Sequence, residues 1–280
     1  YLLDGYRSGI TPNPDVMCNR EIKFGAFLQQ ARAEGFDFVA TGHYARRRED
    51  GPFVRLLEGV DKSKDQSYFL ALLQQRQIRY ALFPIGELLK TEVRSLASEA
   101  GLPNATRKDS QGICFIGQVR IGDFLRAFME DSPGPIVDLE GRQLGLHRGL
   151  HFYTLGQRQG LRVASNTPHK AYVVVEKRPE TNALVVALDE PSTPGLYAQS
   201  ALLGSVSCTT VPLDTRRELL ARPRYRASAI PATYEPRPDG TARITFHTPQ
   251  RALTPGQICA LYDGDEVLGG AVFTQVDPLR

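Results

Sequence analysis

The chain has 280 residues, of which 41% are hydrophobic and 23% are charged, a composition typical of a globular protein with two or three domains. No stretch approaches the roughly 18 apolar residues that a membrane helix needs, and four cysteines without a Cys-x-x-Cys pair argue against a metal site or a disulfide scaffold. The net charge of +3 permits an anionic partner without requiring one, because the arginine clusters are equally explained as solvated faces.

Residues 1–131 alternate between helical and strand patterns. An apolar face predicts a helix over 24–31 that ends at Gly35, and a buried parallel strand is expected at 36–40. Thr41-Gly42-His43-Tyr44 follows at the carboxyl end of that strand, the edge where ligands bind open parallel sheets. Further helices are predicted over 66–75, 90–100 and 121–128.

After Ser132-Pro133-Gly134-Pro135 the hydrophobic period changes to two. A hairpin is predicted from residues 171–176 and 183–188, and short strands at 243–247 and 258–262 are separated by glycine-containing turns. This pattern favours a small closed β-barrel at the C-terminal end. We expect a partial α/β layer in residues 1–131, a β-rich domain in 132–194 and the β-barrel in 195–280.

The first segment with chemical potential contains Cys18. Asn13 followed by Pro14 is typical of a helix N-cap and first helical residue. Cys18 would then lie near a helix N-terminus, where the dipole favours the nucleophilic thiolate. A capped helix with an inert buried cysteine explains the same residues equally well.

The second segment contains Cys114, between Gly112 and Gly117 and shortly after Lys108. Glycines supply backbone freedom and a nearby lysine favours thiolate, as a mobile reactive thiol requires. The alternative is a buried strand in which Cys114 is a small hydrophobic residue.

A third segment, Lys64-Asp65-Gln66, combines a cation with groups that can read a base. Its alternative is a helix start with Asp65 as the cap.

Taken in chain order, these segments resemble the tRNA-specific 2-thiouridylase (MnmA/TrmU) family. The resemblance covers nearly the whole chain and rests on Thr11-Pro12-Asn13-Pro14-Asp15, Cys18-Asn19, Thr41-Gly42-His43-Tyr44, Lys64-Asp65-Gln66-Ser67-Tyr68-Phe69, Phe83-Pro84-Ile85-Gly86, Lys108-Asp109-Ser110-Gln111-Gly112-Ile113-Cys114-Phe115-Ile116-Gly117, Tyr153-Thr154-Leu155-Gly156-Gln157-Arg158, Arg224-Tyr225-Arg226 and Thr254-Pro255-Gly256-Gln257.

The resemblance implies an adenine-nucleotide alpha hydrolase-like, Rossmann-like layer and ATP-dependent 2-thiolation of the wobble uridine of tRNA. ATP, with Mg²⁺, would activate the 2-oxygen. Cys114 would receive sulfur as a persulfide from a donor protein. Cys18 would either release that sulfur, leaving a Cys18–Cys114 disulfide, or act as a nucleophile, and Asp15 would be the acid–base group.

The resemblance also implies binding residues, with Gly42 against the adenosine nucleotide. The positions implied to contact tRNA are Asn13, Pro14, Asp15, His43, Lys64, Asp65, Gln66, Arg224, Tyr225 and Gln257. A cytoplasmic monomer without a membrane association is the corresponding expectation.

One feature of the family is missing from the printed sequence. A phosphate-binding Ser-Gly-Gly-x-Asp-Ser loop should precede Tyr1, which itself falls within a helical pattern, so we interpret the start as a truncation. We therefore expect the chain as given not to adenylate RNA. The alternatives are a non-catalytic tRNA-binding fragment and a ligase acting on a small molecule, and the cysteine pair argues against the ligase.

Overall fold

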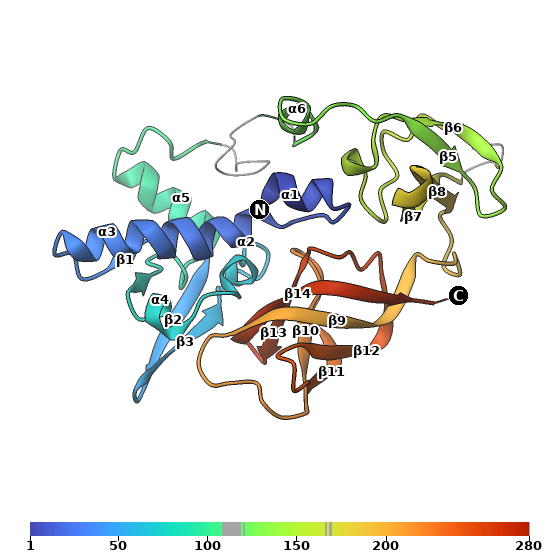
Figure 1. Ribbon diagram of the computed structural model, residues 1–280. Coiled ribbons are helices and arrows are strands. Elements are labelled where there is room, and N and C mark those ends of the chain that lie inside the picture. The colour runs from blue at the N-terminus through green and yellow to red at the C-terminus, as the bar shows by residue number, and fades with distance from the viewer. Residues whose placement is uncertain (108–118, 120, 166, 168–169, 280) are drawn as a thin grey trace.

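The computed structural model describes residues 1–107, 119, 121–165, 167 and 170–279. Figure 1 shows three parts: the N-terminal α/β part, a four-stranded sheet that contains β5 to β8, and a barrel built from β9 to β14. Within these residues no helix is long and apolar enough to cross a bilayer.

The N-terminal part begins with α1 (Leu2–Arg7) and a longer helical run made of α2 (Pro14–Met17), a π-helical segment (Cys18–Phe27) and α3 (Leu28–Ala33). The run ends before Gly35, as predicted, but the predicted apolar face is wrong in one member. Phe24 and Leu28 are buried, whereas Phe27 is 59% exposed. The wider π-helical turn changes which side chains share a face, so a period of 3.6 misplaces Phe27.

Two short strands, β1 (Val39–Ala40) and β4 (Ala81–Leu82), pair in parallel. The strand expected at 36–40 is therefore too long, because Phe36 and Phe38 are exposed before the pairing starts. α5 (Lys90–Glu99) confirms the predicted helix, and Gly101 follows it with a positive φ of 66°.

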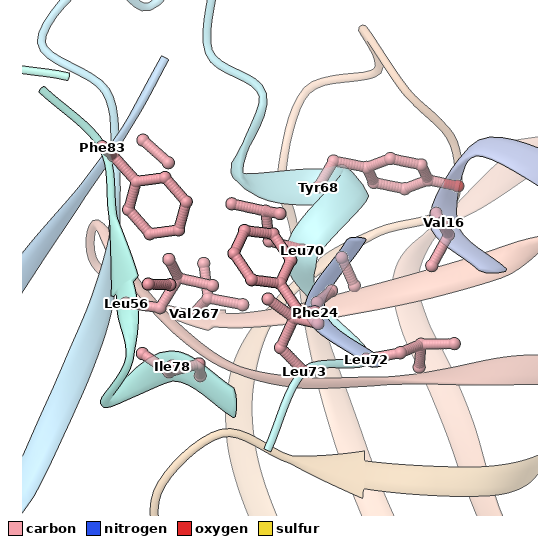
Figure 2. Close-up of a cluster of buried hydrophobic side chains, with 14 of the residues drawn as sticks. Val16, Phe24, Leu56, Tyr68, Leu70, Leu72, Leu73, Ile78, Phe83 and Val267 are labelled. Carbon is pink, nitrogen blue, oxygen red and sulfur yellow. The ribbon is translucent and has the colours of Figure 1, made fainter. Parts of the chain in front are cut away.

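The helix predicted over 66–75 is wrong. A 3₁₀ turn (Ser67–Leu70) leads into non-helical residues, and a short α4 (Gln75–Ile78) follows. Residues 70–73 are all buried, because this apolar run passes through the core instead of presenting one face to it. Figure 2 shows Leu70, Leu72 and Leu73 packed with side chains of the helical run and with Val267.

The middle of the chain contains α6 (Ile121–Arg126) and a sheet in the order β6-β5-β8-β7. Its strands are β5 (Gly134–Val137), β6 (Gln143–His147), β7 (Tyr172–Arg178) and β8 (Ala183–Leu188). The antiparallel pairing of β7 with β8 confirms the predicted hairpin.

The C-terminal strands close into a six-stranded barrel in the order β13-β10-β11-β12-β9-β14, with β13 pairing to β14. The strands are β9 (Tyr197–Cys208), β10 (Arg217–Arg222), β11 (Ile230–Pro236), β12 (Ala242–Arg251), β13 (Ile258–Asp263) and β14 (Glu266–Pro278). The expected fold class, an α/β layer followed by β-rich modules with a final barrel, is confirmed.

The barrel is joined to the N-terminal part by a shared sheet. The antiparallel hairpin of β2 (Ala45–Asp50) and β3 (Phe53–Glu58) extends the barrel, because β3 pairs with β14. Val267 of β14 packs in the same core cluster as Leu56 of β3 (Figure 2). One hydrophobic cluster therefore spans the α/β part and the barrel, and the barrel interior has a second cluster of its own.

Candidate functional site

The start of α2 has the cap that its residues predict. The Asn13 side chain accepts a hydrogen bond from the Val16 amide at 3.2 Å, and Pro14 occupies the first helical position. Asp15 lies in the first turn. Cys18 follows Met17 with helical dihedral angles, and its free thiol is only 7% exposed. The structure thus places Asp15 and Cys18 within the first five residues of one capped helix.

Cys18 begins the π-helical segment, and neighbouring elements hold the backbone of this segment. The Gln77 side-chain amide donates to the carbonyls of Arg20 at 2.8 Å and Phe24 at 3.0 Å. Asn19 donates to the Phe69 carbonyl at 3.2 Å. π-helical turns are rare and are frequent at functional sites. Here the Gln77 amide bonds two carbonyls of the segment, and Asn19 ties the segment to the Phe69 backbone.

Gly42 and His43 lie just beyond the carboxyl end of β1. A Cβ atom added at Gly42 would meet only the Ile85 methyl group, at 4.0 Å, so the backbone is open at this position. The His43 ring lies near Phe24 and Phe83, and its Nδ1 is 2.8 Å from the Thr41 hydroxyl. Burial, together with the positive charge of Lys23, lowers the pKa of His43 to about 4. Its imidazole is therefore neutral at pH 7.

Asp65 and Gln66 have partners within the protein. The Asp65 carboxylate accepts hydrogen bonds from the Gly59 amide at 3.0 Å, from the amide and hydroxyl of Ser67, and from Arg222 at 2.9 Å. The Gln66 side-chain oxygen accepts from the Tyr44 amide at 3.2 Å. Asp65 lies two residues before the 3₁₀ turn and bonds its first amide, but the residue at the cap position is Gln66, so the alternative with Asp65 as the cap is wrong. Contact of this segment with RNA stays a prediction.

The loop between β10 and β11 carries Arg224 and Tyr225. The Tyr225 ring lies against Phe69, with 4.3 Å between ring centroids, and 6.1 Å from Tyr68. Arg226 lies over the Tyr225 ring at 5.4 Å. The aromatic rings bring this barrel loop beside the turn that follows Lys64-Asp65-Gln66, two segments that are far apart in the sequence.

Gln257 and Tyr68 link the barrel to the start of α2. The Gln257 side-chain amide donates to the carbonyls of Thr11 at 2.8 Å and Pro12 at 3.3 Å. The Tyr68 hydroxyl donates to the Ile258 carbonyl at 2.9 Å; burial raises the pKa of this hydroxyl, and the nearby Asn13 side chain opposes the rise. The structure therefore gathers Asn13, Tyr225 and Gln257 around Tyr68, whereas Cys114 lies outside the described residues.

The sequence analysis missed the ion pairs behind this site. Arg222 bonds both Glu58 and Asp65. Arg222 belongs to an arginine cluster, Arg222, Arg224 and Arg226, for which the sequence favoured a solvated face. No local signal identifies a buried arginine in such a run, because its carboxylate partners lie more than 150 positions away.

Comparisons with known proteins agree with this architecture. Residues 1–118 match the family model described as tRNA methyl transferase HUP domain, residues 122–188 the tRNA methyl transferase PRC-barrel domain, and residues 205–273 the aminomethyltransferase beta-barrel domain. The chain is 55% identical, over 99% of its length and 77% of the relative's, to a tRNA-specific 2-thiouridylase MnmA of Akkermansia muciniphila. The chain belongs to the tRNA-specific 2-thiouridylase family.

Other 2-thiouridylases match to a similar extent. The MnmA protein of Aeromonas salmonicida is 43% identical over 98% of this chain and 75% of its own length. That of Listeria monocytogenes is 46% identical over 99% of this chain and 74% of its own length. The resemblance drawn from the motifs is thus confirmed along the whole chain, and the chain spans about three quarters of the length of these 2-thiouridylases.

Proposed function

We propose that the protein is a tRNA sulfurtransferase that replaces the 2-oxygen of the wobble uridine with sulfur in an ATP-dependent reaction. The observation that carries the proposal is the capped helix start, which carries Asp15 and Cys18 and directly follows the backbone that Gln257 holds from the barrel. In a chain 55% identical to a tRNA-specific 2-thiouridylase, a thiol and a carboxylate at this place fit the chemistry of base thiolation.

ATP, with Mg²⁺, would supply AMP as the leaving group on the 2-oxygen of the uridine. The open backbone of Gly42 lies at the carboxyl end of β1, the edge where ligands bind open parallel sheets, and only the Ile85 methyl group comes within 4.0 Å of a Cβ added there. We propose that Gly42 lies against this nucleotide.

In the proposed sulfur transfer, a donor protein leaves a persulfide on Cys114. The terminal sulfur attacks carbon 2 of the uridine and AMP departs. The Cys18 thiolate then attacks the inner sulfur, the sulfur–sulfur bond breaks, and its electron pair stays on the sulfur bound to the base. The product is 2-thiouridine, and the protein is left with a Cys18–Cys114 disulfide. A two-electron thiol reductant then reduces this disulfide to the two thiols. In a second order of events, Cys18 releases hydrosulfide from the persulfide before the base is attacked.

The RNA contacts are proposed from the same part of the molecule. The wobble base lies in a single-stranded loop, so turning it into a site near Asp15 costs only a few kcal/mol. Stacking on an aromatic ring such as Tyr225 recovers ~1–3 kcal/mol. Lys64 and Arg224 would contact phosphates.

We further propose that the protein is a cytoplasmic monomer and that its three domains comprise residues 1–131, 132–194 and 195–280.

The cysteines provide the direct test. Cys18→Ser and Cys114→Ser, each in the full-length protein, should abolish 2-thiouridine formation measured by nucleoside mass spectrometry, while tRNA affinity stays nearly unchanged. Cys208→Ser is the control, because Cys208 lies in β9 of the barrel, and it should retain activity. Thiolation by either of the first two variants would reject the assigned roles. If the wild-type protein binds tRNA but forms no 2-thiouridine, the result would favour a non-catalytic tRNA-binding protein.

A further inference from the structure

The backbone just before the Asn13 cap is held by the barrel. The Thr11 amide donates to the Pro255 carbonyl at 3.0 Å, and the side-chain amide nitrogen of Gln257 donates to the carbonyls of Thr11 and Pro12, at 2.8 Å and 3.3 Å. Gly256 has a φ of +91°, and a side chain there would lie 2.8 Å from the Thr11 carbonyl oxygen. Residues 255–257 therefore fit closely against residues 11–12.

The four-stranded sheet of β5 to β8, here called the central sheet, holds residues 9–12 from another side. The Lys177 ammonium, on β7, donates to the Gly9 carbonyl at 3.2 Å. The hydroxyl groups of Thr11 and Thr154 are 3.3 Å apart. Burial lowers the pKa of Lys177 to about 8. In Figure 1 the N-terminal segment accordingly lies between the β5–β8 sheet and the barrel.

A cavity of about 250 Å³ marks the meeting point of the three parts, and Gly9, Lys177 and Pro255 are among its lining residues. Two loops thus converge on residues 9–12. Both carry motifs of the family resemblance, Tyr153-Thr154-Leu155-Gly156-Gln157-Arg158 and Thr254-Pro255-Gly256-Gln257. Their common feature in the structure is contact with the segment that leads into α2.

We propose that Gln257 and Lys177 are positioning residues, which hold Gly9–Pro12 from the barrel and the central sheet and so set the place of Asp15 and Cys18. This inference rests on the proposed function. The tRNA contact that the resemblance implies for Gln257 does not account for the two bonds that its amide nitrogen makes to the protein's own backbone. Gln257 should therefore act on the rate of the reaction rather than on tRNA affinity.

The expected effect on the rate is large because reacting groups must be placed within a few tenths of an ångström. A displacement of about 1 Å can cost ~10²-fold in rate. Gln257→Glu removes the donor nitrogen and sets a carboxylate against two carbonyl oxygens. Lys177→Met removes one donor while keeping the apolar stem of the side chain. Any movement of Thr11 and Pro12 passes directly to Asn13, the cap of the helix that carries Cys18.

The test measures tRNA dissociation constants and single-turnover thiolation at saturating tRNA in the full-length protein. We expect about a 100-fold lower rate for Gln257→Glu and about 10-fold for Lys177→Met, with dissociation constants within about 3-fold of the wild type. The controls are Gln275→Glu and Lys170→Met, both at exposed positions, which should behave like the wild type. A raised dissociation constant with an unchanged saturating rate, or no effect at all, would overturn the proposal.

Alkylation of Cys18, measured without tRNA by peptide mass spectrometry, separates this inference from the proposed function. Cys18 is 7% exposed, so a loosened segment should raise its alkylation rate at least ~3-fold in both variants. Cys259, two positions from Gln257, is fully buried and should stay unmodified. If the wild type makes no 2-thiouridine, the proposed function fails while this readout still applies. An unchanged Cys18 rate, or a reactive Cys259, would overturn the positioning role.

Discussion

Replacing Arg222 by methionine should destabilise the protein strongly. The guanidinium bonds Glu58 and, at 2.9 Å, Asp65, and it lies over the Tyr262 ring at 4.8 Å from the centroid. The side chains of Arg222, Glu58 and Asp65 are only 14%, 11% and 4% exposed. Methionine fills most of the same space but leaves the carboxylates without this cation.

The size of the effect follows from what remains around each carboxylate. Removing one partner of a buried ion pair costs ~3–5 kcal/mol, because the other charge stays buried. Glu58 keeps Lys62, whose ammonium is 2.5 Å from its carboxylate, so the loss falls mainly on Asp65. Loss of the contact with the Tyr262 ring adds about 0.5–2 kcal/mol. We expect a decrease of about 4 kcal/mol in the free energy of unfolding.

Urea unfolding followed by circular dichroism and tyrosine fluorescence measures this decrease, since the chain contains 11 tyrosines and no tryptophan. Arg216→Met is the control, because its partner Glu235 and Arg216 itself are 42% and 70% exposed, and it should cost less than about 1 kcal/mol. Adding Asp65→Asn to Arg222→Met should recover part of the stability. A loss below about 1 kcal/mol for Arg222→Met, or no recovery in the double variant, would refute the reasoning.

Two further predictions concern RNA binding and pH. Arg224→Ala should weaken tRNA binding and reduce the slope of log K against log salt by about 1, and an unchanged affinity and slope would remove Arg224 from the interface. Because the pKa of His43 is about 4 when folded, below the 6.5 of the unfolded chain, the unfolded state binds more protons between these values. Stability should therefore fall by up to about 3 kcal/mol as the pH drops from 6.5 to 4. Urea midpoints should show this fall in the wild type and less of it in His43→Gln, whereas an NMR titration of His43 near pH 6.5 would contradict it.

Local patterns predicted the features that depend on neighbouring residues. The Asn13 cap, the helix that ends before Gly101, the hairpin of β7 and β8 and the two barrel strands expected at 243–247 and 258–262 all follow from turn chemistry and hydrophobic period. The prediction over 66–75 was wrong because residues 70–73 are buried on every side, and a continuous apolar run has no period to distinguish helix from extended chain.

The sequence by itself thus determined the family, the succession of α/β and β-rich parts, and the residue types available for chemistry. Only the tertiary structure decided which partners those residues have. Asp65, expected to read RNA, is bound to an arginine 157 positions away, and Gln257 holds a backbone 246 positions away. Such pairings are created when β14 joins β3 and the barrel packs on the N-terminal part, and short-range patterns carry no information about contacts at that separation.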